Sequence, residues 1–235
     1  MTPARPADKH SFPTPPSRVE EGVGTGTARL AILLSGRGSN MVALVQAAQT
    51  GALQGLAEVA VVFSNRPDAP GLATAAALGC ATASLPSQGR PRAAFDAEAA
   101  ALLQRYQPDY IVLAGYMRIL SPAFIQPFAG CILNIHPADT RAHQGLHAYE
   151  WAFDNMLPET KITVHLVDEG LDTGPILAQQ TVDLRGADSL AEVERRGLAV
   201  EHELYARALA ALIKKTKGGH AEQREASRPL TNSDI

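Results

Sequence analysis

The feature that most constrains the fold of this chain is a regular alternation of short apolar runs with helical patterns, which begins at residue 30. Continuous apolar runs bounded by turn residues are typical of strands that are buried on both faces of a parallel sheet. The expected strands are 30–34, 59–63, 82–85, 110–114 and 131–135, and the expected helices are 40–49, 71–78, 92–106 and 122–126. The alternation predicts an α/β fold with a mostly parallel sheet and helices on both faces.

The pattern changes after residue 160. Apolar and polar residues alternate over 161–167, and a second strand-like segment at 176–184 follows within hairpin reach. These two segments predict an antiparallel C-terminal extension of the sheet, closed by a last helix near 188–214. Functional groups are then expected at the carboxyl ends of the parallel strands.

Both ends of the chain differ from this middle part. Residues 1–28 hold five prolines among small and charged residues, without a period that could bury a face. We expect a disordered N-terminal extension at 1–28, one domain at 29–215 and a disordered C-terminal tail at 216–235.

Composition excludes several function classes. The chain carries 21 basic and 24 acidic residues, a formal net charge of −3, which does not favour a nucleic-acid or anionic-membrane binder. No apolar run approaches the roughly 18 residues of a membrane-spanning helix, and no signal-peptide core is present at the start. Two cysteines cannot form a disulfide framework, so a reduced, cytoplasmic setting is expected.

A glycine-containing turn, Ser-Gly-Arg-Gly-Ser-Asn at 35–40, joins the first strand to the first helix. Free backbone N–H groups at a helix N-terminus form a phosphate site, although the glycines can equally serve only the tight turn. An NAD site needs a third glycine where Met41 stands, together with an acidic residue after the second strand. Because Arg66 lies there and suits a 2′-phosphate, an NADP-dependent reductase remains a rival interpretation.

The fifth expected strand ends in Asn134-Ile135-His136-Pro137. Since side chains alternate along a strand, Asn134 and His136 point to the same side at the carboxyl end of the sheet. This pair suits acyl transfer, because the amide stabilises a developing oxyanion and the imidazole moves a proton. A structural histidine that is satisfied by hydrogen bonds is the alternative.

Three carboxylates, Asp168, Glu169 and Asp172, lie in the turn at 167–175. Solvated turn charges are the simpler explanation for Asp168 and Glu169. Asp172 is the better functional candidate, because a carboxylate near His136 favours the imidazolium and raises the histidine pKa. The spacing alone does not place any carboxylate beside His136.

Metal and nucleophilic chemistry are less favoured. His143 and His147 have helical i,i+4 spacing and could join His136, but a zinc site needs a further ligand in a geometry that the sequence does not fix. No Gly-x-Ser-x-Gly motif is present, and Cys131 lies in an apolar strand, where an inert core thiol is expected. No metal is expected.

Taken together, the motifs resemble the folate-dependent formyltransferases. The similarity extends through nearly the whole expected domain, and several separate motifs occur in the same order. They are Leu-Leu-Ser-Gly-Arg-Gly-Ser-Asn (33–40), Val-Phe-Ser-Asn-Arg (62–66), Val-Leu-Ala-Gly-Tyr-Met-Arg-Ile-Leu-Ser-Pro (112–122), Leu-Asn-Ile-His-Pro (133–137), Gly-Leu-His (145–147) and Val-His-Leu-Val-Asp-Glu-Gly-Leu-Asp-Thr-Gly-Pro-Ile (164–176).

The resemblance implies a single Rossmann-like formyltransferase domain. Its implied activity is transfer of the formyl group of 10-formyltetrahydrofolate to the amine of 5′-phosphoribosylglycinamide, a step of purine nucleotide synthesis, without a metal. The implied partners are these two small molecules, with neither nucleic acid nor membrane, and the protein is expected to be a monomer or a homodimer.

The resemblance also implies roles for residues. The implied catalytic residues are Asn134, His136 and Asp172. The implied contacts to the ribose-phosphate substrate are Gly38, Ser39, Asn40 and Glu201. The implied folate-side residues are Arg92, Met117, Arg118, Ile119, Leu120, Asn134, Asp168, Glu169, Gly170, Leu171 and Asp172.

The chain departs from the usual family pattern directly after His136-Pro137. The family usually has Ser-Leu-Leu-Pro where this chain has Ala-Asp-Thr-Arg at 138–141, which puts the packing of the loop and the identity of the acceptor in question. A formyltetrahydrofolate hydrolase, or a formyltransferase for another amine, therefore remains an alternative. A catalytically silent binding protein with this fold is a third possibility.

Overall fold

The computed structural model describes residues 26–226, with side chains described up to residue 218. Most of the expected N-terminal extension, residues 1–25, and the last residues of the expected tail, 227–235, lie outside this range.

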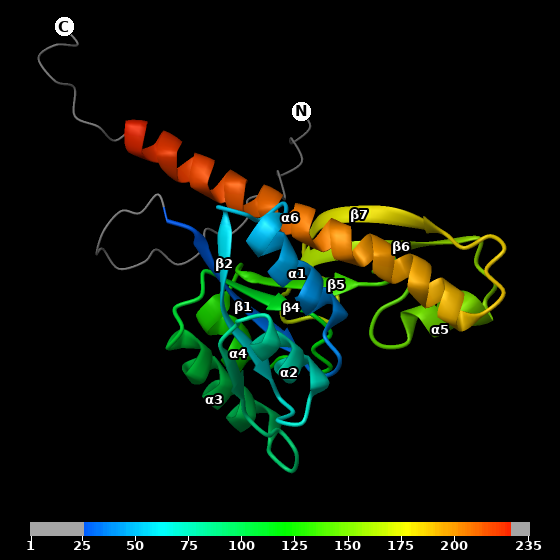
Figure 1. The fold of residues 1–235 in the computed structure, drawn as a ribbon, viewed down its shortest axis with the longest axis horizontal. Coiled ribbons are helices and arrows are strands. Elements are labelled where there is room, and N and C mark those ends of the chain that lie inside the picture. Colours follow the sequence, from blue (N-terminus) through cyan, green and yellow to red (C-terminus); the bar gives the residue numbers. More distant parts are fainter. Residues whose placement is uncertain (1–25, 227–235) are drawn as a thin grey trace, which may run out of the picture.

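Seven strands form one sheet, with helices on both faces (Figure 1). The strands are Ala28–Leu34 (β1), Ala57–Ser64 (β2), Thr82–Ser84 (β3), Tyr110–Leu113 (β4), Ile132–His136 (β5), Glu159–Leu166 (β6) and Ile176–Asp183 (β7). The helices are Ser39–Thr50 (α1), Pro70–Ala77 (α2), Arg92–Gln104 (α3), Pro122–Ile125 (α4), Ala148–Asp154 (α5) and Leu190–Ala226 (α6), and a 3₁₀ turn, Gln126–Phe128, follows α4.

The strand order is β3-β2-β1-β4-β5-β6-β7. Strands β1 to β5 pair in parallel, whereas β6 runs antiparallel to both β5 and β7. This topology confirms the predicted fold class. Strands β2 and β3 are added on one side of β1, and β4 and the later strands on the other, so the strand order reverses between β1 and β4. In open α/β sheets, the crevice at such a point is the usual ligand site.

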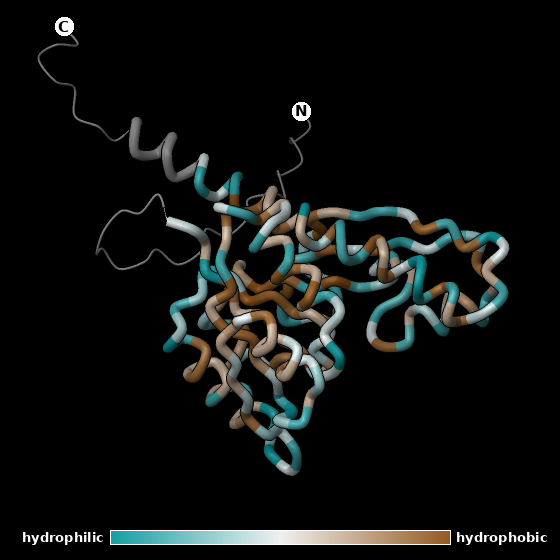
Figure 2. The backbone as a smooth tube through the Cα atoms, in the orientation of Figure 1, coloured by the Kyte–Doolittle hydropathy of each residue, from teal (hydrophilic) through white to brown (hydrophobic). Residues whose placement is uncertain are grey.

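Strand β1 shows why the sequence forms a sheet that is covered on both sides. Leu30, Ile32 and Leu34 pack in one apolar cluster with residues of α1, α5 and α6, while Ala31 and Leu33 pack in a second cluster with residues of α3 and α4. Apolar residues concentrate along the central strands in Figure 2. The continuous apolar runs therefore reflect burial on both faces.

Two helices differ from the expectation. Helix α5 was not predicted, because it has only seven residues and follows a left-handed residue, His147, that does not cap it with its side chain. Helix α6 runs to Ala226, beyond the expected end near 214, so that residues 216–226 of the expected disordered tail are helical and the Lys-Gly-Gly-His segment at 217–220 does not end the helix. Within residues 26–226, no helix is long and apolar enough to cross a membrane.

Candidate active site

Ser35 joins the exits of three parallel strands at the carboxyl edge of the sheet. Its backbone N–H donates to the carbonyl of Gly115 after β4, at 3.0 Å. Its hydroxyl donates to Oδ1 of Asn65 after β2, at 2.6 Å, and accepts the N–H of Met117 at 2.9 Å. These bonds fix the loops after β1, β2 and β4 relative to one another.

The glycine-containing turn leads from β1 into α1 as expected. Gly38 precedes the helix in the left-handed region, with φ +80°, and no side chain caps the N-terminus of α1. At Gly71, a Cβ atom would lie 2.8 Å from a Leu34 methyl group and 2.9 Å from the carbonyl oxygen of Gly36, so glycine is needed there to hold the turn close to α2. The turn is closely packed against α2, and the first N–H groups of α1 have no side-chain cap, an arrangement that suits an anion.

Asn40 and Glu201 meet, although 161 positions separate them. The Asn40 amide donates to Oε2 of Glu201, and the hydroxyl of Tyr149, on α5, donates to Oε1. Glu201 is only 4% exposed, and Oδ1 of Asn40 is buried without a partner. A buried carboxylate thus lies beside the glycine-containing turn.

Asn134, His136 and Asp172 also come together. Nδ1 of His136 lies 3.7 Å from Oδ2 of Asp172, and the amide nitrogen of Asn134 lies 3.4 Å from Oδ1 of Asp172. Asp172 adopts a left-handed conformation, with φ +53°, and its Oδ2 accepts the N–H of Gly145 at 2.8 Å. One carboxylate therefore faces both of the strand-end side chains that the sequence singled out.

The pKa of His136 departs from the expectation. Burial lowers this pKa more than the charge of Asp172 and the hydrogen bond to the His143 carbonyl raise it, so the net pKa lies below the ordinary value rather than above it. For Asp172, burial raises the pKa, but the neighbouring His165 ring, the hydrogen bond from the Gly145 N–H and the charge of His136 outweigh it and lower the net value. At neutral pH the stable combination is a neutral imidazole beside a carboxylate.

The position of the proton on His136 follows from its neighbours. Nε2 lies 3.0 Å from the carbonyl oxygen of His143, which can only accept, so Nε2 carries a proton. The nitrogen that gains and loses a proton is therefore Nδ1, on the side of Asp172. His136 is arranged to take up a proton and then to be stabilised by the carboxylate.

His165 belongs to this cluster and was not singled out from the sequence. It lies opposite Asn134 in the β5–β6 register. Its Nδ1 donates to the carbonyl of Leu166 at 2.9 Å, so Nε2 can accept the Asn134 amide at 3.2 Å. Its place on the polar side of the alternating strand at 161–167 was the available signal, but the neighbour that it faces depends on register.

Apolar side chains are exposed around the same edge. Met117 is 64% exposed and Ile119 57%, and both lie in the loop after β4. Leu146, in the loop after β5, and Leu171, in the β6–β7 turn, are also exposed. A Cβ atom on Gly145 would lie 3.6 Å from Leu171, so the last two loops approach each other. Exposed apolar residues close to a cluster of polar side chains, here the cluster around His136, are typical of a ligand site.

The loop after β4 is held from behind by α3. Asp96 is fully buried; its Oδ2 accepts the N–H of Ser121 at 2.8 Å, and its Oδ1 lies 3.7 Å from the Arg118 guanidinium. Arg118 also stacks on the ring of Phe95 at 4.3 Å. Of the predicted folate-side residues, Arg118 therefore turns inward and Leu120 is buried, while Met117 and Ile119 remain accessible.

The remaining predicted folate-side residues are less closely grouped. Oδ1 of Asp168 accepts the N–H of Gly170 at 3.0 Å and the hydroxyl of Thr173 at 2.7 Å, which shapes the turn. Glu169 is exposed. Arg92 is exposed at the start of α3, and across residues 26–226 no hydrogen bond or ion pair joins it to the other predicted folate-side residues.

The unusual loop at 138–141 is anchored by polar contacts. Nζ of Lys161 lies 2.8 Å from Oδ2 of Asp139, and the Thr163 hydroxyl donates to the carbonyl of Ala138 at 2.7 Å. Ala138 and Thr140 are buried. The loop that lacks the family's apolar residues is thus tied to β6, next to His136.

We expect Lys161→Met to destabilise the fold by no more than about 1 kcal/mol, because the ion pair with Asp139 is partly exposed and screened. The hydrogen bond from Lys161 lowers the pKa of Asp139, so the pair's contribution is present above pH ~4 and is lost as the pH falls through the depressed pKa. Thermal unfolding followed from pH 7 downward through the acidic range in which Asp139 protonates, with Lys161→Arg as the control, measures this. A Lys161→Met deficit that does not shrink as the pH falls contradicts the assignment.

The histidines that the sequence raised as possible metal ligands have other partners. The ring of His143 stacks on His136, with centroids 6.1 Å apart, and lies against Trp151. His147 is exposed, and its Nδ1 lies 2.9 Å from Glu150. No cluster of three or more metal-ligating side chains occurs in the described part of the chain.

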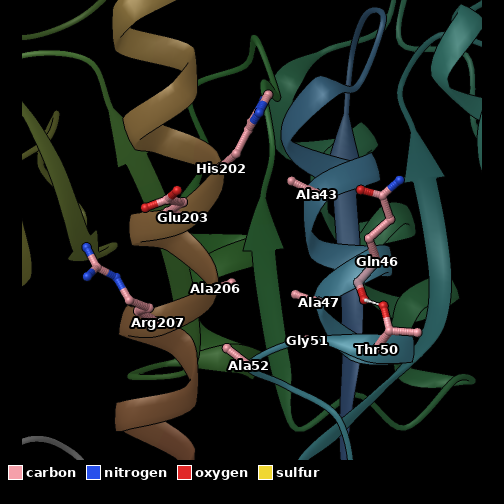
Figure 3. A pocket seen from close by; sticks show the side chains of 10 residues that line it. All are labelled: Ala43, Gln46, Ala47, Thr50, Gly51, Ala52, His202, Glu203, Ala206 and Arg207. Atoms are coloured by element: carbon pink, nitrogen blue, oxygen red, sulfur yellow. Dashed lines mark hydrogen bonds between the residues drawn. The ribbon is translucent and has the colours of Figure 1, made fainter.

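A surface groove of about 390 Å³ lies elsewhere, between α1 and α6 (Figure 3). It is lined by five alanine and glycine residues and by five polar side chains of α1 and α6, namely Gln46, Thr50, His202, Glu203 and Arg207. None of the predicted site residues lines it, so the groove is separate from the cluster around His136.

Comparison with known proteins agrees with this geometry. A family model described as formyl transferase matches residues 28–209. The phosphoribosylglycinamide formyltransferase of Escherichia coli is 41% identical over 177 residues, which cover 75% of this chain and 82% of that protein. The trifunctional purine biosynthetic protein adenosine-3 of Drosophila melanogaster is 36% identical over 85% of this chain, which spans only 15% of that longer protein.

A solved structure gives the same result. The crystal structure of glycinamide ribonucleotide transformylase 1 from Symbiobacterium toebii superposes with a TM-score of 0.78 at 35% identity, and covers 85% of this chain and 94% of that one. Together with the family match over more than half of the residues, this similarity leaves one conclusion: the chain belongs to the formyl transferase family.

Proposed function

We propose that the protein transfers the formyl group of 10-formyltetrahydrofolate to the amine of 5′-phosphoribosylglycinamide. The observation that carries this proposal is the arrangement of Asn134, His136 and Asp172 beside an anion-binding turn, in a chain similar to phosphoribosylglycinamide formyltransferases. We expect it to act in the cytoplasm on these two small molecules, without nucleic acid.

The acceptor is held at two points in this proposal. The N–H groups of the turn at Gly38, Ser39 and Asn40 bind its phosphate, because a helix N-terminus attracts anions. Glu201 accepts hydrogen bonds from the ribose hydroxyls. The folate lies along the exposed apolar residues of the loop after β4 and of the turn at 168–172.

The catalytic steps follow from the geometry. The acceptor amine attacks the formyl carbon and an oxyanion develops, to which the Asn134 amide donates; its contact with Asp172, at 3.4 Å, is long enough to be exchanged for this bond. Nδ1 of His136 takes the amine proton through a water that Asp172 orients. The resulting imidazolium is stabilised by Asp172, and the proton then passes to the departing folate nitrogen.

Two alternatives are less well supported. Arg66, the candidate for a 2′-phosphate contact, pairs with Asp68 at 3.1 Å, and Met41 fills the core where a dinucleotide site needs glycine. A formyltetrahydrofolate hydrolase has the same three catalytic groups, so the assay below is needed to distinguish it from a formyltransferase.

The test is a steady-state assay of tetrahydrofolate release from 10-formyltetrahydrofolate. We expect release to depend on 5′-phosphoribosylglycinamide. Release without the acceptor indicates a hydrolase, and a failure to release tetrahydrofolate in either case overturns the proposal. Substrate analogues with other amines, tested at the same concentrations, measure how far the loop at 138–141 changes the acceptor.

A further inference from the structure

We propose that Tyr149 and Gly197 act together as a positioning pair, which fixes the Glu201 carboxylate so that it accepts the ribose hydroxyls of the acceptor. This inference rests on the proposed function, because it concerns how the acceptor side of the same site is built. Neither residue was among those predicted from the sequence.

The Glu201 carboxylate has an unusual environment. It is buried, and among the described residues no cationic side chain pairs with it; its two oxygens accept hydrogen bonds only from the neutral Tyr149 hydroxyl and the Asn40 amide. Burying a charge without a counter-charge is costly unless its lone pairs are satisfied. A ligand that brings two more neutral donors, such as a vicinal diol, would complete this arrangement.

Asn40 points independently to a ligand site. It is 8% exposed, its amide nitrogen is used by Glu201, and its Oδ1 is buried with no partner. Buried acceptors are nearly always satisfied in native proteins. Together, the unpaired oxygen of Asn40 and the free lone pairs of Glu201 form a cluster of acceptors that suits hydroxyl donors rather than an anion.

Tyr149 is held as a permanent donor to Glu201. Burial and the neighbouring Glu201 charge raise the pKa of Tyr149 far above its ordinary value, so the hydroxyl keeps its proton at any physiological pH. The tyrosine therefore orients one carboxylate oxygen, and Asn40 orients the other.

Gly197 makes room for the tyrosine ring. Gly197 lies on α6, one turn before Glu201, and a Cβ atom there would lie 2.2 Å from both Cε1 and the hydroxyl oxygen of Tyr149. Glycine destabilises the interior of a helix relative to alanine, so its presence here needs a packing reason. The ring occupies the space that any other residue would fill, and its hydroxyl reaches the carboxylate one turn further on.

The first experiment is Tyr149→Phe, with Tyr110→Phe as the matched control, because Tyr110 also loses one hydroxyl hydrogen bond, to Thr216. We expect the KM for 5′-phosphoribosylglycinamide to rise about tenfold or more, since the lost bond is to a charged group, while kcat and the KM for 10-formyltetrahydrofolate stay unchanged. Tyr110→Phe is expected to change none of the three. An unchanged acceptor KM in Tyr149→Phe overturns the inference.

A second experiment separates positioning from general damage to the fold. Gly197→Ala should raise the same KM in the wild-type background, but should add nothing in a Tyr149→Ala background, where no ring remains to be displaced. An acceptor analogue that lacks the ribose hydroxyls should bind wild type and Tyr149→Phe equally. The positioning role is contradicted if Gly197→Ala raises the KM by the same factor in both backgrounds. It is also contradicted if Tyr149→Phe weakens binding of the analogue that lacks the ribose hydroxyls. Inactivity of the wild-type enzyme would instead contradict the proposed function.

Discussion

Asn134→Ala is expected to lower kcat by about 100- to 1000-fold, the loss that accompanies removal of one oxyanion donor in other enzymes. The physical reason is that Nε2 of His165, at 3.2 Å, holds one N–H of the Asn134 amide, so that the other N–H needs only to exchange its long contact with Asp172, at 3.4 Å, for the oxyanion. Because this interaction strengthens in the transition state, kcat should fall far more than either substrate affinity does. Single-turnover kinetics at saturating concentrations of both substrates measure the loss.

Asn155→Ala is the matched control for this prediction. Asn155 is exposed at the end of α5, where its amide donates only to the carbonyl of Trp151. Its loss should leave kcat unchanged. If Asn134→Ala retains a kcat within a few-fold of the wild-type value while it remains folded, Asn134 is not the oxyanion donor, and the role passes to another group of the cluster.

The sequence was most informative where burial imposes a pattern. The apolar runs at 30–34 and 110–114 predicted parallel strands because both of their faces are covered, and the alternation at 161–167 predicted the antiparallel extension. The phase of β5 placed Asn134 and His136 on one side of the sheet. These predictions depend on local periodicity, which the chain carries in its own residues.

What depends on tertiary contacts was not visible in this way. The partnership of His165 with Asn134 depends on the β5–β6 register, and the contact of Tyr149 with Glu201 depends on how α5, an unpredicted helix, lies against α6. The lowered pKa of His136 is a further case. The prediction counted the charge of Asp172 but not the larger opposing effect of burial, which only the folded structure reveals.

Asp172→Asn is expected to shift the acidic limb of the kcat/KM profile to lower pH. In the proposed mechanism the active form has a neutral His136, so the rate falls as the pH drops through the His136 pKa. The Asp172 carboxylate raises that pKa against the larger, lowering effect of burial. Removing the charge lets the pKa fall further, and the enzyme therefore stays in the neutral form at a lower pH than the wild type does.

The same substitution is expected to reduce the plateau rate by about 100-fold or more, because the imidazolium that forms during proton transfer loses its counter-charge, 3.7 Å away. The asparagine oxygen can still accept the N–H of Gly145, so the backbone of the loop should be kept. The measurement is kcat/KM from pH 4.5 to 9, with unfolding followed at each pH. An acidic limb that does not move shows that Asp172 and His136 are not coupled, and a rate that falls as the pH rises through the His136 pKa shows that the protonated histidine is the active form.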